Sequence, residues 1–318
     1  MNIHSLLVLL ADGEIHSGSE LGALLGISRA AIWKKLSNLE VLGLSVESVK
    51  GKGYRLPGGL DLLDSVVLQG FLPPSIQALS VVELALDVES TNQVLLSRDI
   101  DNDVPYQFLF AEMQRSGRGR RGRSWVSPFG KNLYMSVAFE LGGGVDVLNG
   151  LSLVMGVACV RALREVGFSD ARLKWPNDVW VGDRKLAGIL VELRGEATTG
   201  WSVVAGIGLN VYMSDKDAAD IEQPWISLSE LSECSRTRLA AALVQHVVGV
   251  LEVFRKSGFA SFIDEWMEND ALRNRKVDVS GVSISGVAKG VDLTGALCVE
   301  TDAGITPINA GEVSVRPA

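Results

Sequence analysis

The most informative segment of this chain reads Gly117-Arg118-Gly119-Arg120-Arg121-Gly122-Arg123-Ser124-Trp125. It places four arginines and three glycines in one short segment of a chain whose formal net charge is −8. Glycine lets backbone N–H groups approach a ligand closely, and arginine binds phosphate through two charge-assisted hydrogen bonds. The segment therefore predicts a loop that holds an anionic ligand.

The surroundings of this loop favour a folded site. The apolar runs Phe108–Ala111 and Asn132–Phe139 on either side are typical of buried strands. An Arg/Gly run can also be a disordered RNA-binding tail or a nuclear localisation patch, but this one is internal and too short for a low-complexity segment. With Lys174–Asp178 and Arg184–Gly188 further along, the pattern indicates a site that holds a nucleotide phosphate against a small acid.

Composition excludes several classes of protein. The 318 residues suffice for two or three domains, and 47% are hydrophobic. The three cysteines lack metal-ligand or CxxC spacing, and the three histidines are scattered, so neither a metal site nor a Ser-His-Asp triad is supported. No apolar run approaches the roughly twenty residues that span a bilayer. We expect a cytoplasmic protein with no membrane association.

Residues 1–56 have the pattern of a winged helix-turn-helix. Ser17 (or Ser19) and Ser28 are suited to begin helices, and Gly26 supplies the turn between them. The expected elements are a helix over 3–11, a second helix ending at Leu25, a third over 28–42 and a hairpin over 44–56 around Lys50-Gly51-Lys52-Gly53.

The charge of this unit supports DNA binding. Between Arg29 and Arg55 there are six basic residues and two acidic ones, in a chain that is otherwise acidic. Such a local positive face suits a phosphate backbone. The alternative is a small helical interaction domain with solvated lysines. The candidate DNA-binding residues are Ser17, Ser28, Arg29, Lys34, Lys35, Lys50 and Lys52.

Two further units follow the short linker Pro57-Gly58-Gly59. Residues 60–270 mix strand-like and helical runs without regular βαβ alternation, which favours an α+β domain with a mixed or antiparallel sheet. Residues 274–318 contain short alternating strands between glycines, as in a small β-barrel. In the central unit we expect strands over 81–88, 107–113, 133–139, 185–193 and 201–211, and helices over 91–98, 149–166 and 238–268.

Five motifs together carry a family resemblance: Glu89–Asn92, Gln114 with Gly117–Trp125, Lys174–Asp178, Lys185–Glu192 and Gly206–Asn210. In this order, with a winged helix ahead and a small barrel behind, essentially the whole chain resembles the bacterial family of bifunctional biotin–protein ligases and biotin operon repressors. The resemblance implies a central domain like those of class II aminoacyl-tRNA synthetases and a C-terminal SH3-like barrel.

The resemblance also implies an activity. Biotin and ATP, with Mg²⁺, would give biotinyl-5′-AMP and pyrophosphate, and biotin would pass to a lysine of the carrier domain of acetyl-CoA carboxylase. The adenylate-bound protein would form a homodimer and repress the biotin operon by binding its operator DNA. Attack of a carboxylate on the α-phosphate needs no enzyme nucleophile, only cations and N–H groups that stabilise charge.

Site residues are carried over on the matching motifs. The resemblance implies biotin binding by Ser90, Thr91, Asn92, Gln114, Arg118, Gly119, Arg120 and Lys185. It assigns catalytic roles to Lys185, Arg118 and Arg120. It assigns the adenylate or ATP to Arg121, Trp125, Lys174, Asn177, Asp178 and Asn210.

Simpler interpretations of single residues stay open. Ser90 or Thr91 also suits a helix N-cap, and Lys185 also suits a solvated surface. Trp125 stacks near the adenine or belongs to the core. Asp178 either orders the arginine loop or contacts a ligand.

Three other functions remain as alternatives. The first is a ligase without regulatory DNA binding. The second is a biotin-sensing transcription factor without catalysis. The third is a lipoate-type ligase, which the arginine loop and the winged helix disfavour.

Overall fold

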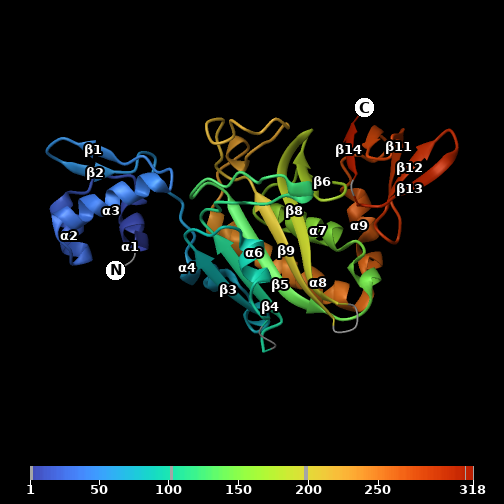
Figure 1. The fold of residues 1–318 in the computed structure, drawn as a ribbon, viewed down its shortest axis with the longest axis horizontal. Coiled ribbons are helices and arrows are strands. Elements are labelled where there is room, and N and C mark those ends of the chain that lie inside the picture. Colours follow the sequence, from blue (N-terminus) through green and yellow to red (C-terminus); the bar gives the residue numbers. More distant parts are fainter. Residues whose placement is uncertain (1–2, 101–102, 197–199, 312, 318) are drawn as a thin grey trace.

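The computed structural model describes residues 3–100, 103–196, 200–311 and 313–317. Three bodies follow one another along the longest axis (Figure 1): a small helical domain, a central sheet with its helices, and a small β-domain. Their order is the predicted one, and the predicted α+β class is confirmed.

The N-terminal body is a winged helix-turn-helix, as predicted. Ser17 and Ser28 each accept a hydrogen bond from a backbone N–H in the first turn of the following helix, at 3.0 and 3.2 Å, so both are N-caps. Gly26 adopts a φ of 65° and ends the second helix. The elements are α1 (Ile3–Leu10), α2 (Gly18–Leu25), α3 (Arg29–Val41), β1 (Glu47–Val49) and β2 (Gly53–Arg55).

The central body is built on a seven-stranded sheet in the order β3-β4-β5-β9-β8-β7-β6. Strands β3 and β4 are parallel and the other neighbours are antiparallel, which confirms the expected mixed sheet. Alternation along β4 sends Phe108 and Phe110 to one core and Leu109 to the other. The strands are β3 (Ser80–Ala85), β4 (Tyr106–Ala111), β5 (Leu133–Leu141), β6 (Ala171–Lys174), β7 (Asp178–Val181), β8 (Arg184–Glu196) and β9 (Gly200–Leu209).

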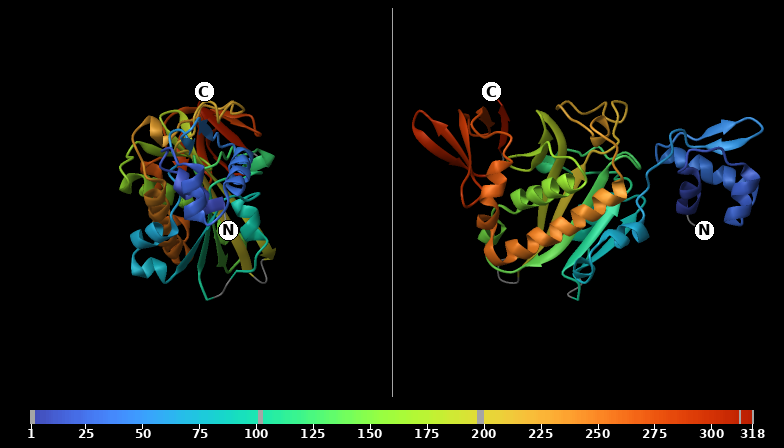
Figure 2. Two further views of the ribbon diagram at one scale, coloured as in Figure 1. Left: turned by 90° about the vertical axis from the view of Figure 1, so that its left-hand side faces the viewer. Right: turned by 180° about the vertical axis from the view of Figure 1, so that it is seen from behind.

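Helices cover both faces of this sheet. The long helices α7 (Leu151–Glu165) and α8 (Arg236–Ser257) lie across one face (Figure 2), and α6 (Thr91–Leu96) packs on the other. The prediction of one helix over 238–268 was wrong. Gly258, with φ 63° and ψ −163°, ends α8, and a 3₁₀ turn leads into α9 (Ile263–Glu268). Two short helices, α4 (Ser65–Phe71) and α5 (Pro74–Gln77), precede β3.

The expectation that no segment is long and apolar enough to cross a bilayer was also wrong. Among the described residues, Asp146–Glu165 and Arg236–Ser257 pass that test by length and composition. However, 61% and 67% of their most apolar windows are buried inside the protein. Both are core helices that pack on the sheet and on each other.

The C-terminal body is a five-stranded antiparallel sheet in the order β13-β12-β11-β10-β14. It docks onto the central body through Trp175, whose side chain is fully buried and donates from Nε1 to the carbonyl of Gly295 at 3.0 Å. The Lys174–Asp178 motif therefore also anchors this domain. The strands are β10 (Lys276–Ser280), β11 (Ile284–Val291), β12 (Leu297–Thr301), β13 (Gly304–Ile308) and β14 (Ser314–Pro317).

A buried ion pair holds the chain that connects the N-terminal body to the sheet. Arg236 is 0% exposed, and its guanidinium lies 2.7 Å from the Glu112 carboxylate. Arg236 also donates to the carbonyl of Asp61 at 2.6 Å, and the backbone N–H of Leu63 donates to Glu112 at 2.7 Å. The linker is thus fixed to β4 and α8 by groups that would be costly to leave unpaired.

Candidate active site and nucleic-acid interface

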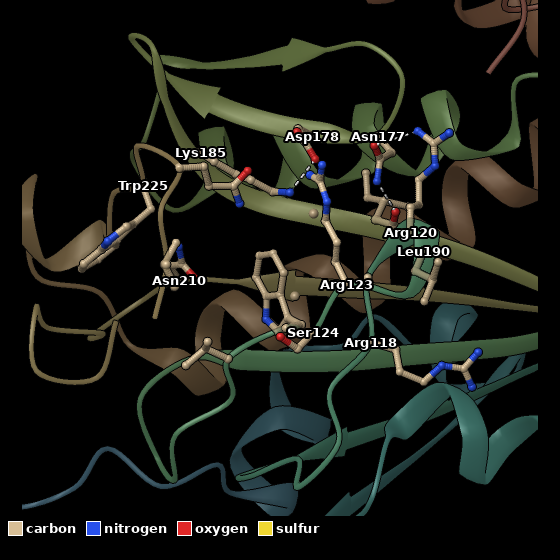
Figure 3. A pocket seen from close by; sticks show the side chains of 18 of the residues that line it. Arg118, Arg120, Arg123, Ser124, Asn177, Asp178, Lys185, Leu190, Asn210 and Trp225 are labelled. Atoms are coloured by element: carbon tan, nitrogen blue, oxygen red, sulfur yellow. Dashed lines mark hydrogen bonds and ion pairs between the residues drawn. The ribbon is translucent and has the colours of Figure 1, made fainter. Parts of the chain in front are cut away.

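A cavity of about 1120 Å³ lies over β5, β8 and β9, between the arginine loop and the C-terminal domain. Every residue predicted for the ligand site lines it. These residues are Ser90, Thr91, Asn92, Gln114, Arg118, Gly119, Arg120, Arg121, Trp125, Lys174, Asn177, Asp178, Lys185 and Asn210. Figure 3 shows the part of the cavity that carries the cations.

One end of the cavity is neutral and polar. Gln114 accepts from the backbone N–H of Thr91 at 2.9 Å and donates to Ser127 Oγ at 3.1 Å. Asn92 is 4% exposed and is held by Ser136 and by the carbonyl of Leu190. Ser90 occupies the N-cap position of α6, but its side chain makes no capping hydrogen bond. Neutral donors and acceptors of this kind suit an uncharged polar group of a ligand.

The arginine loop closes on itself across its base. The N–H of Gly119 donates to the carbonyl of Arg123 at 2.7 Å, and that of Trp125 donates to Gly117 at 2.8 Å. A Cβ at Gly117 would lie 2.6 Å from Ser127 Oγ, so only glycine fits there. The tip is a 3₁₀ turn in which Arg121 adopts a φ of 61°. The glycines thus allow a tight loop beside the cavity.

The loop arginines have different partners. Arg120 donates to Asn177 Oδ1 at 3.2 Å and to the carbonyls of Ala310 and Gly311 at 2.5 and 2.7 Å, so it ties the loop to the C-terminal domain. Burial lowers the pKa of Arg120. Arg118 instead pairs with Glu192, and its side chain points away from the Lys185 group (Figure 3). The two residues predicted to be catalytic on the loop therefore lie in different surroundings.

The other end of the cavity concentrates positive charge around one carboxylate. Asp178 lies 2.8 Å from Lys185 Nζ and 3.6 Å from Lys174 Nζ. Burial lowers the pKa of Lys174, which is 8% exposed. Arg123 extends toward the same group (Figure 3). Seven lysines and arginines line the cavity as a whole against four acids, and this excess of positive charge favours an anionic ligand.

Trp125 lies flat on the glycines of β8 and β9. A Cβ at Gly208 would come within 2.5 Å of Trp125 Nε1, and one at Gly188 would lie 3.0 Å from the ring. The ammonium of Lys185 sits 5.3 Å from the ring centroid, a cation–π distance. The indole Nε1 is buried and has no hydrogen-bond partner. Trp125 is thus part of the cavity wall.

Several residues that line the cavity were not predicted from the sequence, and one of them lies beside Asn210. Asn210 itself was predicted, and its side-chain amide donates to the carbonyl of Ile226 at 3.2 Å. Trp225 lies beside Asn210 because its backbone pairs with that of Lys185 in an isolated β-bridge. Trp180, under the ammonium of Lys174 at 5.1 Å, and Arg316 of the C-terminal domain also line the cavity. Their positions depend on long-range contacts and give no local sequence signal.

The candidate DNA-binding residues divide into two kinds. Ser17 and Ser28 cap helices, whereas Arg29 and Lys34 are exposed on α3, the second helix of the helix-turn-helix. Lys35 on α3 is half-buried, and Lys50 and Lys52 are exposed on the turn between β1 and β2. Sequence reasoning missed Trp33, which is 63% exposed on α3 between these basic residues.

No group of three or more His, Cys, Asp or Glu side chains that could hold a metal occurs in the described part of the chain. Asp178, the acid at the centre of the cation cluster, is held by lysines.

Comparisons with known proteins agree with this architecture. Residues 85–210 match the Biotin/lipoate A/B protein ligase family, residues 3–55 an HTH domain, and residues 277–316 the Biotin protein ligase C terminal domain. The chain is 42% identical to the bifunctional ligase/repressor BirA of Escherichia coli, over 98% of this chain and 97% of that protein. It is 31% identical to BirA of Bacillus subtilis, over 96% and 95% of the two chains.

A solved structure shares the fold of the catalytic part. The biotin protein ligase of Aquifex aeolicus, in complex with biotin and ATP, superposes with a TM-score of 0.64 at 27% identity, covering 74% of this chain and 99% of that one. The chain therefore belongs to the biotin protein ligase family, in the group of bifunctional ligase/repressors that carry an N-terminal helix-turn-helix domain.

Proposed function

We propose that this protein joins biotin to ATP to form biotinyl-5′-AMP, transfers biotin to a lysine of the acetyl-CoA carboxylase carrier domain, and represses the biotin operon when adenylate-bound. The observation that carries the proposal is the polarity of the cavity beside the arginine loop. Neutral hydrogen-bonding groups line one end and an excess of cations lines the other. A ligand with a ureido ring at one end and an acyl phosphate at the other matches this polarity.

In the first step the biotin carboxylate attacks the α-phosphate of ATP, a C–O–P linkage forms, and pyrophosphate leaves. Ser90, Thr91, Asn92 and Gln114 hold the ureido ring, so that the carboxylate points toward Lys185. Lys185 and Arg120 stabilise the negative charge that builds up on the phosphoryl oxygens, an effect that depends on charges being in place beforehand. The contact between Lys185 and Asp178 at 2.8 Å supports that role, because it fixes the ammonium in the cavity.

The nucleotide end rests on the remaining cavity residues. We assign Arg121, Lys174 and Asn177 to the phosphates and ribose, and Trp125 and Asn210 to the base. Mg²⁺ would neutralise the ATP phosphates. Because both oxygens of Asp178 face lysines, substrate phosphates and water would supply most of the Mg²⁺ ligands.

In the second step the neutral amine of the acceptor lysine attacks the acyl carbon, an amide bond forms, AMP leaves, and the amine loses a proton. The cavity must therefore stay open to a protein-borne side chain. Its position at the surface, between the arginine loop and the C-terminal domain, supports access by a carrier domain.

The regulatory half rests on the N-terminal domain. We assign residues 1–56 to DNA binding, residues 60–270 to catalysis and residues 274–318 to the C-terminal barrel. Arg29, Lys34, Lys50 and Lys52 form the face that meets the operator phosphates, and a homodimer of adenylate-bound chains would span two half-sites. Three free cysteines support a reducing, cytoplasmic location.

The test has two arms. The protein is incubated with ATP and either biotin or lipoate, and the acyl-adenylate is sought by mass spectrometry. A biotin operator fragment is then titrated in a mobility-shift assay with and without biotin plus ATP. Adenylate formation with no ligand effect on DNA affinity would support a ligase without regulation. Ligand-dependent DNA binding without adenylate would support a sensing transcription factor.

A further inference from the structure

We propose that Glu192 is a positioning residue of the biotin site, which fixes both the Asn92 amide and the arginine loop. The inference rests on the proposed function. Glu192 lies on β8, and its side chain is 18% exposed. One carboxylate oxygen accepts from Asn92 Nδ2 at 2.9 Å, and the other pairs with the guanidinium of Arg118. Glu192 itself does not line the cavity.

The carboxylate fixes the direction of a hydrogen-bond chain into the cavity. Because a carboxylate only accepts, Asn92 must turn its NH₂ toward Glu192 and its oxygen toward Ser136. Ser136 lies 2.5 Å from that oxygen and donates its single proton to it. The hydroxyl of Thr91 lies 2.7 Å from that of Ser136 and donates its own proton to Gln114 Oε1 at 3.1 Å. The orientation of the Asn92 amide in the cavity wall thus follows from Glu192.

The packing around Asn92 leaves no room for a second orientation of its side chain. Its side chain is 4% exposed, and a Cβ at Gly206 would lie only 3.0 Å from its Cγ. Asn92 Nδ2 also donates to the carbonyl of Leu190 at 3.2 Å, so both of its donors are used by the protein. Loss of the acceptor at Glu192 would leave a buried donor unsatisfied in the wall of the biotin pocket.

The same residue determines what Arg118 does. The guanidinium of Arg118 is neutralised by Glu192 and points away from Lys185 and Asp178 (Figure 3). Its backbone forms the closed base of the loop, opposite Ser124. Arg118 therefore acts as the clamp that holds the loop on β8, whereas Arg120 is the loop cation near the reacting phosphate.

A glutamine at position 192 cannot replace the carboxylate. It has one acceptor, and both of its neighbours are donors, so one of the two contacts must break. A methionine at position 118 removes one of these donors. In the double variant the glutamine oxygen is then free to accept from Asn92. The geometry thus requires that the effects of Glu192→Gln and Arg118→Met do not add.

The experiment measures steady-state adenylate formation and trypsin cleavage of the ligand-free loop. We expect Glu192→Gln to raise the KM for biotin about tenfold, the size typical of one lost charge-assisted hydrogen bond. The kcat and the KM for ATP should stay within about twofold. Trypsin should cut the loop faster in Glu192→Gln and in Arg118→Met. The double variant should bind biotin no more weakly than Glu192→Gln.

Glu83→Gln is the matched control. It also removes a carboxylate paired with an arginine, Arg98 at 3.0 Å, but on the edge strand β3. Glu83→Gln should change neither the KM for biotin nor the rate at which trypsin cleaves the loop. An unchanged KM for biotin in Glu192→Gln, or multiplicative effects in the double variant, would overturn the proposal. If the wild type makes no adenylate, the proposed function fails instead. The trypsin comparison still tests the clamp, and equal cleavage rates in all variants would refute it.

Discussion

Lys185→Ala should reduce adenylate formation by about 10²- to 10³-fold, or roughly 3 kcal/mol of transition-state stabilisation, as when one preorganised charge-stabilising group is removed. The structure supports the upper part of this range. The Lys185 side chain is 16% exposed, its ammonium is 2.8 Å from Asp178, and it sits 5.3 Å from the Trp125 ring centroid. A cation that is mostly buried and held in place contributes more than a solvated one.

Folding should be little affected, because the backbone hydrogen bonds of Lys185 to Pro224 and Ile226 remain. Asp178 also keeps Lys174, at 3.6 Å, as a partner. The proximity of Lys185 is one cause of the low pKa of Lys174, so the substitution also favours the charged form of Lys174. That compensation cannot restore the wild-type rate, since Lys174 lies farther from Asp178 and against Trp180.

The assay is pyrophosphate release at saturating biotin and ATP, with thermal unfolding measured on the same samples. Lys256→Ala, which removes an exposed lysine at the end of α8, is the control and should behave like the wild type. A folded Lys185→Ala protein with near-normal turnover would refute the assignment of the cation to the reacting centre.

Four further outcomes are expected. Arg120→Gly should let biotinyl-5′-AMP escape faster, because the loop loses its tie to Asn177 and the C-terminal domain; equal retention in a dialysis assay would contradict this. Asp270→Asn should stabilise the protein at pH 7.5 by up to about 3 kcal/mol. Burial raises the pKa of Asp270 from 3.8 to about 6, so the wild type loses stability as pH rises through that range. If urea denaturation shows that Asp270→Asn raises the free energy of unfolding as much at pH 4 as at pH 7.5, this reasoning is refuted. The double variant Lys50→Ala/Lys52→Ala should bind the operator more weakly. The slope of the logarithm of the binding constant against the logarithm of salt concentration should become shallower by up to about two, because each lost phosphate contact removes about 0.9. Replacing operator thymines with deoxyuridine should weaken the wild type but not Trp33→Ala, if the exposed indole contacts thymine methyl groups.

The sequence was most informative where function restricts local backbone geometry. Gly117 and the glycines of β8 and β9 are dictated by close contacts with Ser127, Asn92 and Trp125. Ser17 and Ser28 act as caps within three residues of their own position. Each requirement selects one residue type at one position, so it leaves a readable pattern even where the contacting residue is distant in the chain, as at Gly206 and Gly208. The same holds for the apolar, strand-like runs that predicted β4, β5, β8 and β9.

The missed features depend on partners that are distant in the chain. Strands β6 and β7 have four residues each and flank Pro176, too short for a periodic signal. Trp175 looked like part of a ligand motif, yet its indole anchors Gly295 of the C-terminal domain. Arg118 and Arg120 are equivalent in sequence. Only the fold shows that one meets Glu192 and the other meets Asn177.

The arginine loop and the linker to the N-terminal domain are held by the same residues. The loop leaves β4 through Glu112 and Met113 and returns at Phe129. Phe129 and Met113 pack in the apolar cluster that also contains Leu56 and Leu60 from the linker region. Glu112 binds Arg236, which in turn holds the carbonyl of Asp61. One apolar cluster and one buried ion pair therefore connect the two ends of the loop to the linker. Because removing one partner of such a pair costs about 3–5 kcal/mol, Glu112 and Arg236 resist separation of the linker from the ends of the loop.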